Sequence, residues 1–213
     1  MKHILTALVL GISLIFASGS LVYAQDFQKG LEAAKRGNYA VAYWEWTVAA
    51  EQGDAVAQLF LGQMFFEGLG VLQDYKVAKI WFEKSASKNI SMAQNNLGSI
   101  YENGKGVAQD LQKAVIWYQK AAVQGDKNAQ FNLGAFYFDE GGDLNLMYSY
   151  MWFKISLENG VNIAKENVDF LKTKMSSSHV EKADFFIYEC LKKQRGCLER
   201  LAHMTFNPLT QNR

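Results

Sequence analysis

AQNNLG, at residues 93–98, is the middle copy of a phrase that this 213-residue chain repeats. The other copies are AQLFLG at residues 57–62 and AQFNLG at residues 129–134, so the closing glycines are spaced 36 residues apart. A fixed period of this length is typical of arrays in which small structural units stack on one another. The phrase therefore predicts a repeat protein.

Each repeat has the pattern of two helices joined by a glycine-rich loop. The first helix carries the phrase, and the loop follows it, as in GKGV at residues 104–107. An aspartate then precedes the second helix, Asp74 in one repeat and Asp110 in the next, where its side chain can cap the helix N-terminus. Degraded units are expected before and after the core repeats, which we place at about residues 53–88, 89–124 and 125–159.

The glycine that closes the phrase lies inside a helix, where glycine costs about 1 kcal/mol relative to alanine. Its recurrence in all three copies indicates a packing role, in which the missing side chain lets the second helix approach closely. Bulky aromatic residues of the second helix would fill the space around this contact. We expect Trp81, Trp117 and Trp152, which recur at the repeat phase, to be core residues.

The two ends of the chain predict export and a flexible tail, with one solenoid domain between them. Residues 1–24 have a positive start, an apolar run and small residues before the end, which is the pattern of a cleaved signal peptide. An uncleaved membrane anchor is the alternative, although the apolar run is short for a spanning helix. We expect residues 25–204 to form one solenoid domain without an internal linker, and residues 205–213 to form a flexible tail.

Two cysteines, Cys190 and Cys197, stand near the C-terminus, and export to an oxidising compartment predicts a disulfide between them. A free-thiol role is the minor alternative. Residues seven apart on one unbroken helix lie about 10 Å apart along its axis, which is too far for a disulfide. The last helix, expected to open with a capping box of Ser178 and Glu181, should therefore end before Cys197, with Gly196 as its C-cap glycine.

Composition argues against several functional classes. The chain carries 22 basic and 21 acidic residues without a basic stripe, so nucleic acid is not an expected partner. No second apolar run is long enough to span a bilayer, so no integral span is expected after signal cleavage. His179 and His203 lack further ligands at metal spacing, and Asp139, Glu140 and Asp143 lack the ligand spacing of a calcium loop. We therefore expect no metal, no cofactor and no catalytic residue.

One short motif points to a different function. Ser85-Ala86-Ser87-Lys88 matches Ser-x-x-Lys, which carries the nucleophile of serine β-lactamases and penicillin-binding proteins. The chain has neither the Ser-Asp-Asn nor the Lys-Thr-Gly motif that accompanies it in those enzymes. We therefore interpret the stretch as an exposed helix end.

The repeats resemble the Sel1-like repeat family, a relative of the tetratricopeptide repeats. The resemblance covers about residues 39–175 and rests on the pattern Gly-Asp-x-x-Ala-Gln-x-x-Leu-Gly-x-x-Tyr-x-x-Gly-x-Gly-Val-x-x-Asp-x-x-x-Ala-x-x-Trp. It implies an all-α fold, a right-handed superhelical solenoid of antiparallel helix pairs with a concave, ligand-facing side.

The resemblance also implies a function. Known members mostly bind other proteins, so we expect a non-enzymatic adaptor or regulator of the bacterial cell envelope with a protein or peptide partner. A periplasmic location is expected, with secretion as the alternative, and we expect a monomer. One disulfide-rich branch of the family has been described as binding or hydrolysing β-lactams, so a cell-wall or β-lactam-binding protein or hydrolase is the alternative function.

In such an array the concave groove is lined by positions three before, one after and four after the phrase glycine of each first helix. With two neighbouring asparagines, the candidate partner-binding residues are Gln63, Phe66, Asn95, Asn96, Ser99, Glu102, Phe131, Asn132 and Phe138. Paired asparagines can hold an extended peptide backbone through donors and acceptors. Together with the phenylalanines they would form an amphipathic groove. The alternative is that several of these side chains pack against the next repeat.

Overall fold

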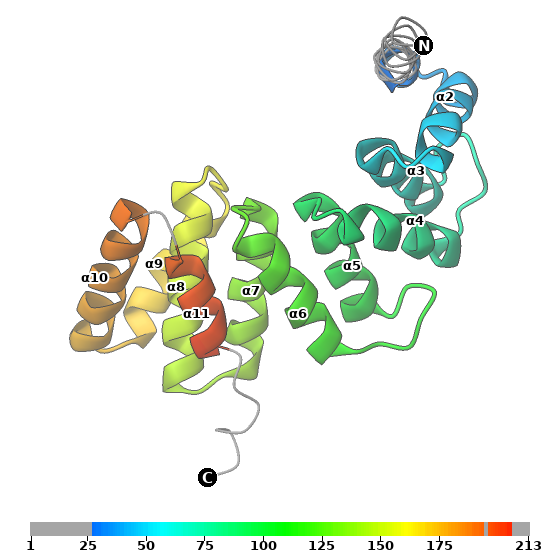
Figure 1. The fold of residues 1–213 in the computed structure, drawn as a ribbon. Coiled ribbons are helices and arrows are strands. Elements are labelled where there is room, and N and C mark those ends of the chain that lie inside the picture. Colours follow the sequence, from blue (N-terminus) through cyan, green and yellow to red (C-terminus); the bar gives the residue numbers. More distant parts are fainter. Residues whose placement is uncertain (1–26, 194–195, 206–213) are drawn as a thin grey trace, which may run out of the picture. The chain divides into compact units, whose positions relative to one another are not determined.

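The computed structural model describes residues 27–193 and 196–205, and this part of the chain is helical and contains no β-strand (Figure 1). It groups into two compact units, one ending at Ile90 and the other beginning at Ser91. The predicted signal peptide and residues 206–213 of the predicted tail lie outside the described residues. The predicted all-α fold of antiparallel helix pairs is confirmed.

The first unit begins with a helical segment at residues 27–35 and continues with three helices. These are α2 (Tyr39–Glu51), α3 (Ala55–Glu67) and α4 (Tyr75–Ser87). The carboxylate of Asp54 accepts the backbone N–H groups of Val56 and Ala57, and that of Asp74 accepts those of Lys76 and Val77. Both aspartates thus satisfy donors that a helix start leaves without partners.

Trp46 anchors the core of the first unit. Its ring centroid lies 4.8 Å from that of Phe60, and its indole N–H donates to the carbonyl of Phe27 at 3.3 Å. The contact ties the segment at residues 27–35 to α2 and α3. Trp44, two residues earlier, is off the buried face of α2 and is 68% exposed.

The second unit contains seven helices within the described residues. They are α5 (Ser91–Asn103), α6 (Leu111–Ala122), α7 (Lys127–Glu140), α8 (Asp143–Glu158), α9 (Ala164–Lys174), α10 (Ser177–Lys193) and α11 (Cys197–Thr205). Asp110 and Asp126 cap α6 and α7 as Asp74 and Asp54 cap the corresponding helices of the first unit. Among the helices of the described ranges, none has both the length and the apolarity to cross a bilayer.

Each phrase glycine faces one aromatic ring of the following helix, as the packing argument predicts. The pairs are Gly62 with Phe82, Gly98 with Tyr118, and Gly134 with Phe153. A Cβ built on either Gly62 or Gly134 would lie 2.7 Å from the facing ring, closer than real Cβ atoms approach their neighbours. The helices of each pair are thus packed more closely than alanine would allow.

The tryptophans that recur at the repeat phase are not all core residues, as we had expected them to be. Trp152 is fully buried, as predicted, but Trp81 and Trp117 are only half-buried. Lys84 and Lys120 place their ammonium groups 3.9 and 4.3 Å from these two rings, in cation–π contact. In these first two repeats the fully buried ring belongs to the residue after tryptophan, Phe82 or Tyr118, because that position faces the glycine.

The phrase glutamine joins one helix pair to the next. The side chain of Gln58 donates to the carbonyl of Ala50 at 3.0 Å, and that of Gln130 donates to the carbonyl of Ala122 at 3.1 Å. Both acceptors belong to the last turn of the preceding helix, where carbonyls lack intrahelical partners. Both glutamines are almost fully buried. Their bonds satisfy polar groups that would otherwise be costly to bury.

The degraded fourth unit, which follows the third repeat, packs Ala164, Val168 and Leu171 of α9 into the core. The predicted capping box is wrong. The helix α10 begins at Ser177, one residue before the expected cap, and the hydroxyl of Ser176 accepts the N–H of His179 at 3.3 Å. Ser176, Ser177 and Ser178 are consecutive, so the sequence leaves the capping residue ambiguous by two positions, and in the structure the first of them is the cap.

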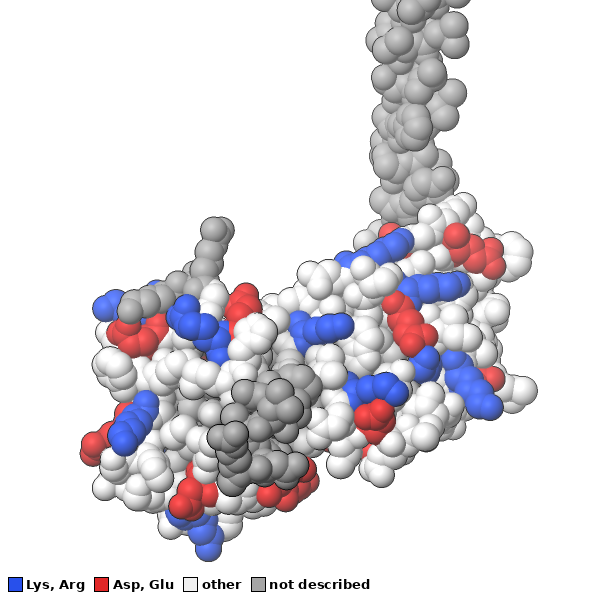
Figure 2. Space-filling model, turned by 60° about the horizontal axis from the view of Figure 1, so that its bottom comes forward, with Lys and Arg blue, Asp and Glu red and all other residues white. Residues whose placement is uncertain are grey.

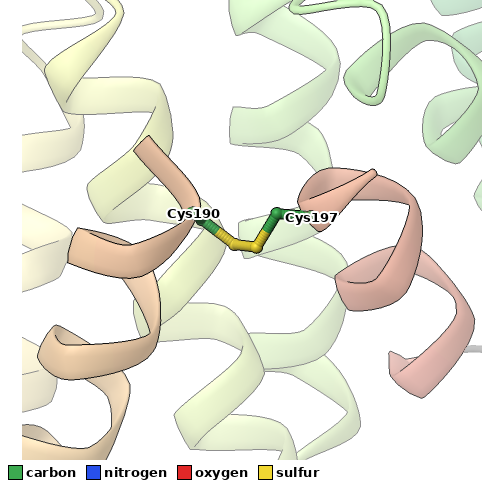
Figure 3. Close-up of a disulfide and its surroundings, with 2 residues drawn as sticks. All are labelled: Cys190 and Cys197. Carbon is green, nitrogen blue, oxygen red and sulfur yellow. A yellow bond between two sulfur atoms is a disulfide. The ribbon is translucent and has the colours of Figure 1, made fainter. Parts of the chain in front are cut away.

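The disulfide between Cys190 and Cys197 joins the end of α10 to the start of α11 (Figure 3). The Cα atoms are 5.1 Å apart, and Gly196 has the positive φ of 73° that favours glycine at a chain reversal. The predicted bridge and the predicted end of the helix before Cys197 are therefore confirmed. The helix α11 itself was not expected. It packs Leu201 into the core of the second unit.

Candidate partner-binding face

Two of the predicted groove residues are in direct contact. The side-chain amide of Asn132 on α7 donates to Oδ1 of Asn95 on α5 at 3.0 Å, and both side chains are half-buried. This bond uses one donor of Asn132 and one acceptor of Asn95. Since an asparagine side chain has two donors and an oxygen with two lone pairs, the pair retains hydrogen-bonding capacity. Asn96, the neighbour of Asn95, is also half-buried.

The next turns of α5 carry Ser99 and Glu102, which are both half-buried. Oε2 of Glu102 accepts the hydroxyl of Tyr118 at 2.8 Å. Burial, followed by the nearby charge of Glu102, raises the pKa of Tyr118 well above its ordinary value, so the phenol stays protonated. The carbonyl of Ser99 accepts the side-chain amide of Asn103 at 2.9 Å. The acidic group on this part of the face is therefore held in place by a buried phenol.

An aromatic region follows on α7. Phe131 packs its ring edge-on against Phe153, with the centroids 5.0 Å apart. Phe138 is 40% exposed, and its ring lies 5.9 Å from that of Phe170 on α9, which is 47% exposed. The ammonium group of Lys174 lies 5.2 Å from the Phe170 ring. Sequence reasoning missed Phe170 and Lys174, because they lie beyond the last recognisable copy of the phrase.

These contacts define one face of the second unit, which we call the α5–α7–α9 face. Its members, in chain order, are Asn95, Ser99, Glu102, Phe131, Asn132, Phe138, Phe170 and Lys174. The face changes from amide groups to exposed aromatic rings along the helices. An extended peptide or a helix with an apolar side is the kind of partner that such a surface suits.

The two candidates of the first unit lie in a separate compact body. The side chain of Gln63 hydrogen-bonds the carboxylate of Glu67 and lines a small apolar pocket of about 220 Å³ beside Trp46. Phe66 is half-buried, with its ring 5.3 Å from that of Tyr75. The alternative that a candidate residue serves packing instead of partner binding therefore applies to Phe66 more than to the asparagines.

The Ser-x-x-Lys stretch is part of the packing of the first unit. Ser85 is fully buried, not exposed as expected, and its hydroxyl donates to the carbonyl of Ala55 at 2.7 Å. Lys88 donates to the carbonyl of Gly53. Ser156 occupies the corresponding place in the third repeat and donates to the carbonyl of Lys127 at 2.8 Å. A buried hydroxyl with this role is not accessible to a substrate, which argues against Ser85 as a nucleophile.

The surface charges are mixed. Lysine, arginine, aspartate and glutamate side chains are interspersed with uncharged areas on the face shown in Figure 2. Over the residues that the structure describes, no three histidine, cysteine, aspartate or glutamate side chains gather as a metal site would require. Asp139, Glu140 and Asp143 are all exposed at the junction of α7 and α8.

Comparisons with known proteins bear on the repeats. A family model described as the Sel1 repeat matches residues 55–90, 91–126 and 127–161. Each range begins two residues after a predicted repeat boundary, at or next to the first residue of α3, α5 or α7. None of the curated proteins matches the chain in sequence.

Two of the solved structures with a similar fold are bacterial proteins. The first is c5321, "a protective antigen present in uropathogenic Escherichia coli strains displaying an SLR fold", which is 28% identical with a TM-score of 0.65. The match covers 83% of this chain but only 39% of that one, so the present chain spans about two fifths of the E. coli protein. The second is a Sel1 repeat protein from Oxalobacter formigenes, 25% identical with a TM-score of 0.65, covering 85% of this chain and 83% of the other.

Proposed function

This chain belongs to the Sel1 repeat family, whose members generally mediate protein–protein interactions, and we propose that it is a non-enzymatic adaptor or regulator of the bacterial cell envelope. In this proposal the α5–α7–α9 face binds a segment of a partner protein. The partner is an extended peptide or a helix that presents backbone or amide groups to the asparagines and an apolar side chain to the phenylalanines.

The observation that carries the proposal is the bond between Asn95 and Asn132. These residues are at different places in the repeat, since Asn95 corresponds in phase to Phe131 and Asn132 to Asn96. The side chains needed for stacking recur in every repeat. The position of Asn95 differs in all three copies, being leucine in the first and phenylalanine in the third, and the position of Asn132 is phenylalanine in the first copy. Differences at surface positions of a repeat array are where binding specificity is built, because the recurring positions are committed to packing.

The aromatic end of the face supports the same function. Phe138 and Phe170 together expose two rings on neighbouring first helices, beside the cation of Lys174. Aromatic side chains that are buried on binding contribute much of the energy of protein interfaces. A partner with an apolar anchor followed by an acidic group would match both features.

The envelope location is supported by two features of the chain. The first is the predicted signal peptide at residues 1–24, and the second is the Cys190–Cys197 disulfide, a bond that persists in oxidising compartments. We propose the periplasm, with secretion into the medium as the alternative. Fractionation of cells that express the full chain, with protease treatment of intact and opened cells, separates these locations from the cytoplasm.

Site-specific cross-linking tests the binding face. A photoreactive amino acid replaces Ser99 on the face, and in a matched control it replaces Gln112, which is exposed on α6. Irradiation of envelope fractions should produce a discrete adduct from position 99 and none from position 112. The adduct should decrease at least several-fold when Asn95→Ala and Asn132→Ala are introduced together.

A second pair of substitutions controls for general effects of asparagine and glutamine loss. Asn162→Ala with Gln112→Ala changes two exposed amides elsewhere in the second unit. If this control and the asparagine pair yield the same adduct in the same amount as the unsubstituted protein, the face is not the binding site. If cells localise the chain in the cytoplasm, the envelope role is wrong, whatever the face binds.

A further inference from the structure

The helix α10 lies at the edge of the second unit (Figure 1), and the exposed fractions of its residues show that one of its sides faces solvent. Successive residues of a helix turn by about 100°, so residues at spacings of four, seven and eleven lie in one line along it. We call this line the α10 stripe, and it consists of Glu181, Phe185, Tyr188 and Lys192.

Contacts on the other sides of α10 determine which side faces outward. Ile187 and Cys190 are buried toward the core of the unit. Oδ1 of Asp184 accepts the hydroxyl of Tyr150 at 2.7 Å and the ammonium group of Lys154 at 2.6 Å, both from α8. The helix therefore cannot rotate to bury the stripe without breaking these bonds.

The stripe is more apolar than the end of a repeat array needs to be. Terminal units usually have a polar outer side, because water lies beyond them. Here Phe185 is 69% exposed and Tyr188 is 59% exposed. Leu191, on the same helix, is 41% exposed, so the apolar area extends beyond the two rings, and contiguous apolar patches are typical of interaction surfaces.

The chemical order along the stripe is acid, aromatic, aromatic, base. We propose that the stripe binds the same stripe of a second copy of this chain, with the two α10 helices antiparallel. In this antiparallel arrangement the acid of one stripe lies opposite the base of the other, and the aromatic residues lie opposite each other. Phe185 then meets Tyr188 of the second copy, and Glu181 meets Lys192 of the second copy. Twofold symmetry makes each contact occur twice.

Three further properties fit this occupant. Antiparallel helices align their dipoles favourably, and Glu181 and Lys192 lie nearer the N- and C-terminal ends of the helix, where their charges suit that dipole. The formal net charge of the chain is +1, so copies do not repel one another at long range. The stripe itself carries one acid and one base, so a second copy supplies an opposite charge for each of them.

The association should be weak. Four side chains from each copy are far fewer than the roughly 20 residues a side of a stable interface, so dimers should form reversibly at high protein concentration. We expected a monomer from the sequence, which does not show which side of residues 177–193 is covered. This inference is independent of the proposed function, since the stripe and the α5–α7–α9 face are formed by different helices.

Sedimentation velocity over a range of protein concentrations tests the proposal. The unsubstituted protein should shift reversibly from monomer toward dimer. Glu181→Lys places like charges at both ends of the paired stripes, and so does Lys192→Glu. Each single change should reduce the association constant by roughly tenfold, and the two changes together should restore it. Phe185→Ser should abolish the dimer.

The control is Glu158→Lys, which makes the same charge change at an exposed residue of α8 and should leave the association unchanged. Circular dichroism confirms that each variant is folded. A chain that stays monomeric at every concentration overturns the proposal, and so does a dimer that the single changes do not weaken. Flotation of a monomeric protein with anionic vesicles, lost in Phe185→Ser, would assign the stripe to a membrane surface instead.

Discussion

Gly98 of α5 and Tyr118 of α6 are in direct contact, and the contact leaves no room for a methyl group. A Cβ placed on Gly98 would overlap the Cε1 and Cδ1 atoms of the Tyr118 ring. The same ring donates its hydroxyl to Glu102, one turn further along α5. The repeat phrase and the candidate binding face therefore share a single side chain, which packs with its ring and positions an acid with its hydroxyl.

We expect Gly98→Ala to destabilise the protein, although alanine is the better helix former. The gain in helix propensity is about 1 kcal/mol, and overpacking a core costs about 1–3 kcal/mol, so a net loss of about 1 kcal/mol is expected. Urea unfolding measures the change. In a Tyr118→Ala background the ring is absent, and the same glycine substitution should then be neutral or stabilising. A loss of equal size in both backgrounds would contradict the contact.

Stability should decrease in alkaline solution because of Tyr118. Its pKa is raised in the folded protein, whereas an unfolded tyrosine has a pKa of about 10. Below that pH both states are protonated and the full stability is present. As the pH rises further, the unfolded state loses its proton first and is favoured. Urea midpoints between pH 8 and pH 11 measure the slope.

Tyr118→Phe is the variant that isolates this effect. It should lower stability near neutral pH, because a hydrogen bond to a charged acceptor contributes about 1.5–3 kcal/mol. It should also make the alkaline slope less steep, leaving the parts due to Tyr148 and Tyr150. Burial raises the pKa of both, and the bond to Asp184 raises that of Tyr150 further. Tyr39→Phe, at a half-buried residue of the first unit, serves as the control. An unchanged slope in Tyr118→Phe would assign the alkaline loss elsewhere.

Reduction of the disulfide should affect the end of the second unit and not the repeats. The bridge closes a short loop, so its contribution is expected to be about 2–3 kcal/mol or less. Hydrogen exchange should show lower protection in α11, which the bridge holds against the core through Leu201, and little change in α5 to α8. Cys190→Ser with Cys197→Ser should reproduce the result. Loss of all cooperative unfolding on reduction would show that the whole unit depends on the bridge.

Ser85 should not react with β-lactams. Its hydroxyl is buried and donates to the carbonyl of Ala55, so a fluorescent penicillin should label neither the unsubstituted protein nor Ser85→Ala. The substitution should instead cost about 1 kcal/mol of stability through the lost hydrogen bond. Ser87→Ala, two residues along and exposed, should cost less. Labelling that disappears in Ser85→Ala alone would restore the hydrolase alternative.

The repeat phrase was sufficient to predict the helix pairs, their caps and the close contact at the glycines. These features depend on residues near in sequence or at a fixed repeat spacing, such as Asp74 at the start of α4. The tryptophans show the limit of that reasoning. Trp117 and Tyr118 are adjacent and both recur, yet only the direction of each side chain on the helix decides that the tyrosine is buried and the tryptophan half-exposed.

The candidate site was predictable in part. Their positions in the repeat identified Asn95 and Asn132 as surface residues of first helices. Their hydrogen bond, however, joins two different positions of the repeat phrase, so it depends on how α5 and α7 are offset. Phe170 was not identifiable, since the degraded fourth unit lacks the Leu-Gly that marks the phase. In the structure, its contact with Phe138 places it on the same face.

By itself, the sequence determined the fold class, the repeat family and the pairing of two cysteines. It could do so because a short-range periodic pattern specifies helices and their stacking. Only the tertiary structure decided which serine caps α10, that α11 folds onto the core, that Ser85 is buried and that Phe185 and Tyr188 are exposed. These outcomes depend on which side of each helix meets a neighbour, and beyond the regular repeats no periodic signal carries that information.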